Sequence, residues 1–158
     1  MSRPPNLYDA FSKQALYTEA LRHYNDTYEA LVWARFRAAG KVREAVLCYL
    51  MDSAAALTGS LADNPLGCMV TLASVGGERV RSARAVTLER LQARLSRAVS
   101  VGELPAVTDV RALARFVQTV QSGMSILARD GASRAELESV AQVTMLRWDA
   151  CAWCRPIS

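Results

Sequence analysis

The stretch that decides the fold lies at the start of the chain, where residues 3–24 read R-P-P-N-L-Y-D-A-F-S-K-Q-A-L-Y-T-E-A-L-R-H-Y. A proline pair suits the first turn of a helix, because the backbone N–H groups there have no partner within the helix. We therefore expect a short helix over residues 4–11. A longer helix is predicted from residue 13; it continues or kinks beyond residue 24 and ends at Gly40. Its predicted apolar face comprises Leu16, Ala20, Tyr24, Leu31 and Ala34.

The rest of the chain also follows helical spacing, and no segment shows the sustained alternation that is typical of a strand. The predicted fold class is therefore all-α. Residues 41–57 carry an apolar stripe, and residues 78–101 predict a further helix with one charged face. Residues 66–75 carry no charge, so we expect a helix that is buried on every side at the centre of the domain. The stripe of residues 41–57 consists of Val42, Val46, Leu50, Ala54 and Leu57.

The clearest pattern lies in residues 110–127, where apolar side chains recur about every 3.5 residues, a spacing typical of a helix packed nearly parallel to a partner helix. Thr108 or Asp109 is expected to cap this helix. Ser133 and Glu136 match a capping box and predict the start of the last helix. The two seams comprise Val110, Leu113, Val117, Val120, Met124 and Leu127, then Leu137, Ala141, Thr144 and Trp148. The pattern predicts a helical hairpin, and its partner helices can belong to the same chain or to a second copy.

Composition places the chain among globular proteins. Of its 158 residues, 51% are hydrophobic and 22% are charged, which argues against disorder. The apolar content indicates extra buried surface in an interface or a ligand cavity, or simply alanine-rich helices. No stretch reaches the ~20 apolar residues of a membrane span, and residues 1–8 lack the apolar region of a signal peptide. We therefore expect a cytoplasmic protein without membrane contact, and the net charge of +4 permits a polyanionic partner without requiring one.

Residues 3–24 resemble the second half of the helix-turn-helix domain of the TetR/AcrR family of transcription regulators, whose recognition helix carries a pattern like R-P-P-S-L-Y-x-A-F followed by a lysine. Residues 54–69, 102–116 and 123–137 resemble one subgroup of that family, in the same order and spacing. The resemblance implies a TetR-like helical domain that binds a small ligand and forms a homodimer, usually through its last two helices. It also implies a regulator that mostly represses transcription and leaves its operator DNA when the ligand binds.

The resemblance is incomplete at the N-terminus. The family has two residues between the phenylalanine and the lysine, whereas one residue separates Phe11 from Lys13. We also expect counterparts of the two helices that precede the recognition helix to be missing. We therefore expect an incomplete helix-turn-helix over residues 1–24, a ligand-binding and dimerisation domain over residues 25–150 and a tail over residues 151–158. The alternative is a dimeric helical protein that binds a small molecule and has no DNA affinity.

The resemblance implies DNA contacts near the N-terminus. Arg3 and Asn6 can read base edges, whereas Tyr8 and Lys13 match positions near phosphates; alternatively, Tyr8 packs against the next helix and Lys13 is solvated. A ligand pocket is expected among aromatic and methionine side chains, although plain core packing would use the same residues. The pocket candidates are Trp33, Phe36, Tyr49, Cys68, Met69, Leu72, Phe116 and Met124. The dimer interface is expected to use Val110, Leu113, Val117, Val120, Met124, Leu137, Ala141, Thr144 and Trp148.

No pattern predicts catalysis, a cofactor or a metal. His23 is the single histidine, and the residue types around it do not make a catalytic triad or a metal-ligand set. Cys151 and Cys154 have the C-x-x-C spacing of redox and metal sites, but a second such pair is missing. We expect an exposed, oxidisable tail there, with a thiol-based enzyme or redox switch as the distant alternative. Cys48 lies in an apolar helical pattern, where a free cysteine behaves as a small hydrophobic residue.

Overall fold

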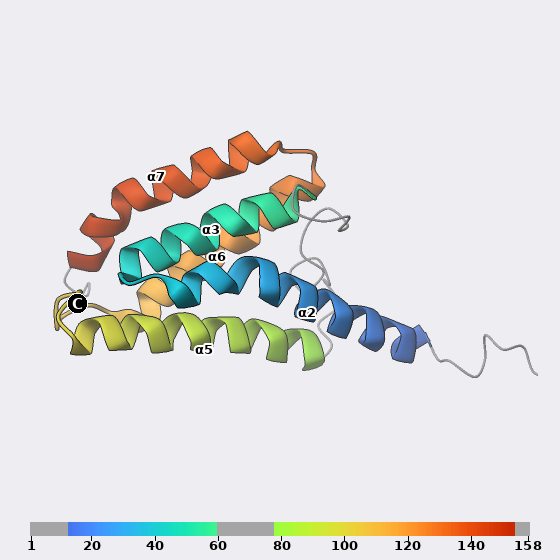
Figure 1. Cartoon of the computed structure of the whole chain (residues 1–158), viewed down its shortest axis with the longest axis horizontal. Coiled ribbons are helices and arrows are strands. Elements are labelled where there is room, and N and C mark those ends of the chain that lie inside the picture. Colours follow the sequence, from blue (N-terminus) through green and yellow to red (C-terminus); the bar gives the residue numbers. More distant parts are fainter. Residues whose placement is uncertain (1–12, 60–77, 154–158) are drawn as a thin grey trace, which may run out of the picture.

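The computed structural model describes residues 13–59 and 78–153, and every regular element in these two segments is an α-helix (Figure 1). The helices are α2 (Lys13–Ala38), α3 (Val42–Leu57), α5 (Glu78–Ser100), α6 (Val110–Arg129) and α7 (Arg134–Trp153). The prediction of an all-α fold is confirmed. The helices expected over residues 4–11 and 66–75 lie outside the described residues. Among the described helices, none has the length and apolar character needed to cross a membrane.

Helix α3 occupies the centre of the described part and contacts α2, α5, α6 and α7. Twelve of its sixteen residues are buried, and the whole predicted stripe from Val42 to Leu57 is among them. Burial extends beyond the stripe because alanines at positions 54–56 add little volume, so that neighbouring helices can approach from several sides. Within the described residues, the central place expected for residues 66–75 therefore belongs to α3.

Helix α2 is continuous from Lys13 to Ala38, but only its C-terminal half packs on the bundle (Figure 1). Val32, Trp33 and Phe36 are buried there. The predicted apolar face is wrong at two positions, because Leu16 is 56% exposed and Ala34 is exposed as well. Leu31 packs partly buried against the core as predicted, and the side chains of Ala20 and Tyr24 lie outside the described part. The prediction assumed one buried stripe along the whole helix, whereas the N-terminal half extends past the described helices that could cover it.

Local signals placed the starts of α6 and α7 correctly. Asp109 caps α6, because its Oδ1 accepts a hydrogen bond of 2.9 Å from the backbone N–H of Ala112. Ser133 and Glu136 form the predicted capping box: the N–H of Ser133 donates to Glu136 Oε2 (2.7 Å), and the N–H of Glu136 donates to Ser133 Oγ (3.3 Å). Helix α7 continues to Trp153, so the tail predicted from residue 151 is helical over its first three residues.

The segment between α5 and α6 is fastened to the turn between α2 and α3. Glu103 Oε2 accepts a hydrogen bond of 2.6 Å from the N–H of Val42, the first residue of α3. A carboxylate suits this place, since the N–H groups of the first helical turn lack partners within the helix and carry partial positive charge. Arg94 on α5 donates to the carbonyl of Ala39 at 3.3 Å and lies 4.0 Å from the carboxylate of Glu103. Together these contacts connect the turn between α2 and α3 to the segment between α5 and α6 at one end of the bundle.

Candidate functional site

The expected DNA contacts cannot be placed from these helices. Arg3, Asn6 and Tyr8 lie outside the described residues, and Lys13 is the first residue of α2. These four assignments therefore stay predictions.

Three of the predicted pocket residues form an aromatic cluster in the core. The ring of Trp33 lies 5.0 Å from that of Phe36 and 4.7 Å from that of Tyr49, centroid to centroid. All three side chains are buried, and the guanidinium of Arg90 covers Trp33 at 5.3 Å from the ring centroid. The cluster joins α2 to α3 as core packing, the alternative that the sequence left open. Met124 is also buried and Phe116 is partly exposed on α6, whereas Cys68, Met69 and Leu72 lie outside the described residues.

A polar triad inside the bundle was missed by sequence analysis. Tyr28 on α2 donates a hydrogen bond to Ser53 Oγ on α3 (3.2 Å), and Gln121 Nε2 on α6 donates to Tyr28 Oη (3.0 Å). Ser53 and Gln121 are buried and Tyr28 is partly buried. We call these three residues the polar triad; it joins α2, α3 and α6 within a mainly apolar core. Buried polar groups need such partners, since an unpaired one costs roughly 1–3 kcal/mol.

One signal in the sequence could have found the triad. Gln118, Gln121 and Ser125 recur at the helical spacing of the apolar residues of α6 and share its buried face. Polar residues at core positions predict interior hydrogen bonds. Gln118 follows the same rule, because its Nε2 donates to the carbonyl of Arg84 on α5 (2.8 Å).

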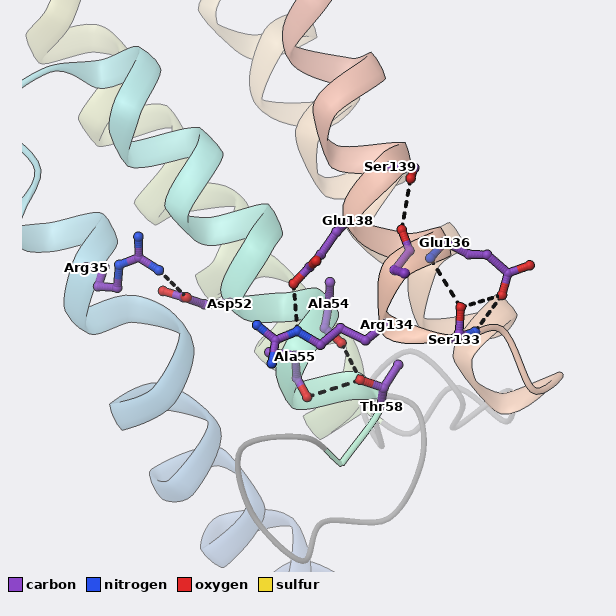
Figure 2. A network of polar contacts seen from close by, with 11 residues as sticks. Arg35, Asp52, Ala54, Ala55, Thr58, Ser133, Arg134, Glu136, Glu138 and Ser139 are labelled. Atoms are coloured by element: carbon purple, nitrogen blue, oxygen red, sulfur yellow. Dashed lines mark hydrogen bonds and ion pairs between the residues drawn. The ribbon is translucent and has the colours of Figure 1, made fainter.

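A second polar contact ties α2 to α3 on the side shown in Figure 2, where Arg35 Nη1 lies 2.7 Å from Asp52 Oδ1. The two partners differ in exposure: the side chain of Arg35 is 64% exposed and that of Asp52 only 11%. Asp52 Oδ2 is buried and has no hydrogen-bond partner among the described residues. Burial raises the pKa of Asp52 above its usual value, and the opposing effect of Arg35 is smaller.

The other titratable candidates form no chemical centre in the described part. Cys48 is buried near this ion pair, and burial raises the pKa of its thiol, which disfavours the reactive thiolate. His23 is exposed on α2. Cys151 lies in the last turn of α7, and Cys154 is outside the described residues. Residues 13–59 and 78–153 contain no group of three His, Cys, Asp or Glu residues that could hold a metal ion.

The predicted dimer seams face the interior of the same chain. Of the nine interface candidates, Val110 and Val120 are partly exposed and the other seven are buried in the single chain. The buried seven are Leu113, Val117, Met124, Leu137, Ala141, Thr144 and Trp148. They cannot present a surface to a second copy, because α3, α6 and α7 already bury them against one another. The heptad spacing identified most of the buried face of both helices, with Leu127 as an exposed exception at 46%, and the helices that cover this face belong to the same chain.

A second apolar seam lies on the outer face of the same two helices. On α6 it comprises Phe116, Val120, Gly123 and Leu127, spaced by four, three and four residues, and on α7 it comprises Val140 and Val143. We call these six residues the outer seam. Val143 is 60% exposed, and Leu146 nearby is 78% exposed. No charged residue occurs from Phe116 to Ala128 or from Ser139 to Leu146. A solvent-facing helix normally carries charges on its outer face, and their absence is typical of an interface core.

Comparison with known proteins places these helices in a family. The chain is 32% identical over 157 residues to the HTH-type transcriptional repressor ComR of Escherichia coli (strain K12), a match that covers 93% of this chain and 74% of ComR. No model of a protein family matches the sequence.

Two solved structures share the fold. Both contain cysteine mutants of the TetR family transcriptional regulator CifR complexed with 26-base-pair double-strand operator DNA. One superposes with a TM-score of 0.80 at 31% identity and covers 91% of this chain and 79% of the CifR chain. The other gives a TM-score of 0.81 at 32% identity and covers 92% and 80%, respectively.

The fold and the relatives define a helical transcription regulator. The chain belongs to the TetR family of transcription regulators, as the resemblance of residues 3–24 and of the three later stretches predicted.

Asp52 gives a testable pH dependence. A carboxyl whose pKa is higher in the folded than in the unfolded state makes folding less favourable as the pH rises through the interval from its usual value near 3.8 to the raised value. We predict that Asp52→Asn removes this loss, so that the free energy of unfolding of the variant rises relative to that of the wild type as the pH increases above about 3.8. Urea unfolding at a series of pH values measures the difference. The control is Glu89→Gln, because Glu89 is an exposed carboxylate. If the free energy of unfolding of the wild type instead rises relative to that of Asp52→Asn with increasing pH, the ion pair with Arg35 outweighs the effect of burial.

Proposed function

We propose that the chain is a homodimeric transcriptional repressor that binds operator DNA and releases it when a small effector binds. Two comparisons support the repressor and DNA assignments: ComR is by name an HTH-type transcriptional repressor, and both CifR structures contain operator DNA. The single structural observation that carries the dimer is the uncharged outer seam on α6 and α7.

The direction of three helices is compatible with two DNA-binding segments of a dimer contacting one DNA duplex. Helices α2, α6 and α7 all run along the long dimension of the molecule (Figure 1). A twofold axis along that direction brings the outer seams of two copies together and keeps the N-terminal ends of both α2 helices on the same side. The part of the sequence that resembles a recognition helix, residues 3–11, precedes α2 in the chain. Such a dimer has an isologous interface, in which the same patch is used twice, and its operator is an inverted repeat.

The dimer is tested by placing a charge on the outer seam. We predict that the wild type is a dimer and that Val143→Asp is a folded monomer, because a carboxylate buried without a partner in an interface costs roughly 3–5 kcal/mol. Sedimentation velocity over a concentration series measures the association. Val86→Asp is the matched control, since Val86 is a similarly exposed valine on α5. A Val143→Asp variant with the association constant of the wild type would remove the outer seam from the interface.

DNA binding is tested without knowledge of the operator. Selection from a randomised pool of duplex DNA with the full chain is expected to enrich an inverted repeat, and the affinity for it should fall steeply with salt, since phosphate contacts release counterions. The monomeric Val143→Asp variant should bind the same repeat much more weakly, because it engages one half-site at a time. Failure to enrich any sequence would favour the alternative of a dimeric small-molecule-binding protein without DNA affinity.

The effector assignment is supported by the polar triad. Pockets in helical domains are mostly apolar, with a few convergent polar groups that orient the ligand, and the triad brings three such groups together from α2, α3 and α6. Only uncharged side chains make up the triad, which suits a neutral effector with a hydroxyl, carbonyl or amide group.

A thermal-shift screen of neutral polar and apolar compounds tests this assignment. Compounds that stabilise the wild type are expected to lose most of their effect on Gln121→Leu, which removes the amide, and to release the selected DNA. The matched control is Gln142→Leu, an exposed glutamine on α7. Compounds that stabilise both variants equally would place the effector elsewhere.

A further inference from the structure

Gly123 lies in the interior of α6, where no contact with the other described residues requires a glycine. Apart from its own helix backbone and its two neighbours in the chain, a methyl group built on its Cα would meet no atom of the described residues within 4 Å. Three other glycines have equal space, but each has a backbone role: Gly40 follows the end of α2, and Gly102 and Gly131 adopt positive φ angles of 78° and 96°, which other residues rarely do. Gly123 has no such angle and belongs to a regular helix.

A glycine at this place weakens the isolated subunit. Within a helix, glycine is the least favourable residue after proline, because it has the most backbone freedom to lose on folding. Alanine would fit the open space beside Gly123 without a clash. The packing among the described residues of one chain therefore gives no advantage that offsets this loss of stability.

The surroundings of Gly123 indicate what occupies that space. Gly123 lies at the middle of the outer seam on α6, between Val120, one turn before it, and Leu127, one turn after it. Val120 is partly exposed and Leu127 is 46% exposed. The uncharged stretch from Phe116 to Ala128 extends on both sides. Because α6 carries no charged side chain from Phe116 to Ala128, a helix can approach this stretch without removing an ionised group of α6 from water.

We propose that Gly123 is the point where a helix of a second copy of this chain packs directly against the backbone of α6. This inference rests on the proposed homodimer and adds the position of closest approach. Helices usually pack 8–10 Å apart, with the distance set by the side chains at the contact. A glycine at the crossing lets the two backbones come nearer, which permits Cα–H···O contacts as well. The glycine therefore weakens the subunit and strengthens the dimer.

The experiment compares Gly123→Leu and Gly123→Ala with the wild type. Sedimentation velocity over a concentration series gives the dimer dissociation constant, and circular dichroism checks that each variant is folded. Ala93→Leu is the matched control, because Ala93 is an exposed small residue within α5. Gly123→Leu is expected to raise the dissociation constant by about 10-fold or more, since overpacking a well-fitted contact typically costs 1–3 kcal/mol. Ala93→Leu should leave it unchanged.

Gly123→Ala separates the two effects and covers the case in which leucine prevents folding. In the monomeric Val143→Asp background, Gly123→Ala should raise the melting temperature by roughly 2–4 °C, the shift expected for a gain of 1 kcal/mol in a chain of this size. In the wild-type background it should weaken dimerisation. A glycine needed only within its own chain would instead lower the melting temperature in both backgrounds.

The outcomes distinguish this inference from the proposed function. If the wild type dimerises, Val143→Asp is monomeric and both Gly123 variants keep the wild-type dissociation constant, the contact at Gly123 is wrong and the homodimer stands. If the wild type is monomeric at every concentration, the homodimer and the contact are both wrong.

Discussion

The structure depends on the burial of α3. This helix contacts each of the four other described helices, so its side chains decide where all of them lie. Most of α3 is covered and twelve of its sixteen residues are buried, yet two of the buried residues are the polar Asp52 and Ser53 in adjacent positions. Their partners come from α2 and α6: Arg35 for Asp52 and, through Tyr28, Gln121 for Ser53. These hydrogen bonds are directional and fix the register of the surrounding helices, which apolar contacts alone specify less strictly.

Helix α6 has two apolar seams with different uses. The inner seam, which includes Val117 and Met124, closes the core of the chain. The outer seam includes Phe116, which is partly exposed, and Leu127, which is 46% exposed. A helix that is apolar on two sides is expected where it is covered on both, and the described part of the chain covers only one side of α6. The inner seam of α6 therefore packs in the core of the subunit, and the outer seam is available for the proposed dimer. Helix α2 packs on the same core and follows the residues that resemble a recognition helix.

Sequence analysis succeeded where the determining forces are local. The cap at Asp109, the capping box at Ser133 and Glu136, and the end of α2 before Gly40 follow from hydrogen bonds and backbone preferences within a few residues. The family resemblance was likewise carried by short stretches. What failed depended on contacts between distant segments. The spacing of α6 could not distinguish a partner helix in the same chain from one in a second copy, and the stripe assigned to α2 ignored that half of this helix lacks a described neighbour.

The candidate site was predicted only in part, for a related reason. Aromatic residues such as Trp33 and Tyr49 were correctly expected inside, but whether they line a pocket or fill a core depends on how closely α2 and α3 approach, and the observed ring contacts are those of a filled core. The polar triad could not be predicted from the spacing within any one helix, because its three members lie on α2, α3 and α6. Tyr28, Ser53 and Gln121 become a unit only when three helices are assembled.

The most direct test of the account is amide hydrogen exchange, followed by mass spectrometry, at protein concentrations below and above the dissociation constant of the dimer. Slowest exchange is predicted for α3 at both concentrations, because it is the core of the subunit itself, and α6 and α7 should gain protection at the higher concentration. Rapid exchange in α3, or exchange in α6 and α7 that does not change with concentration, would contradict an organisation of one inner seam for the core and one outer seam for a partner.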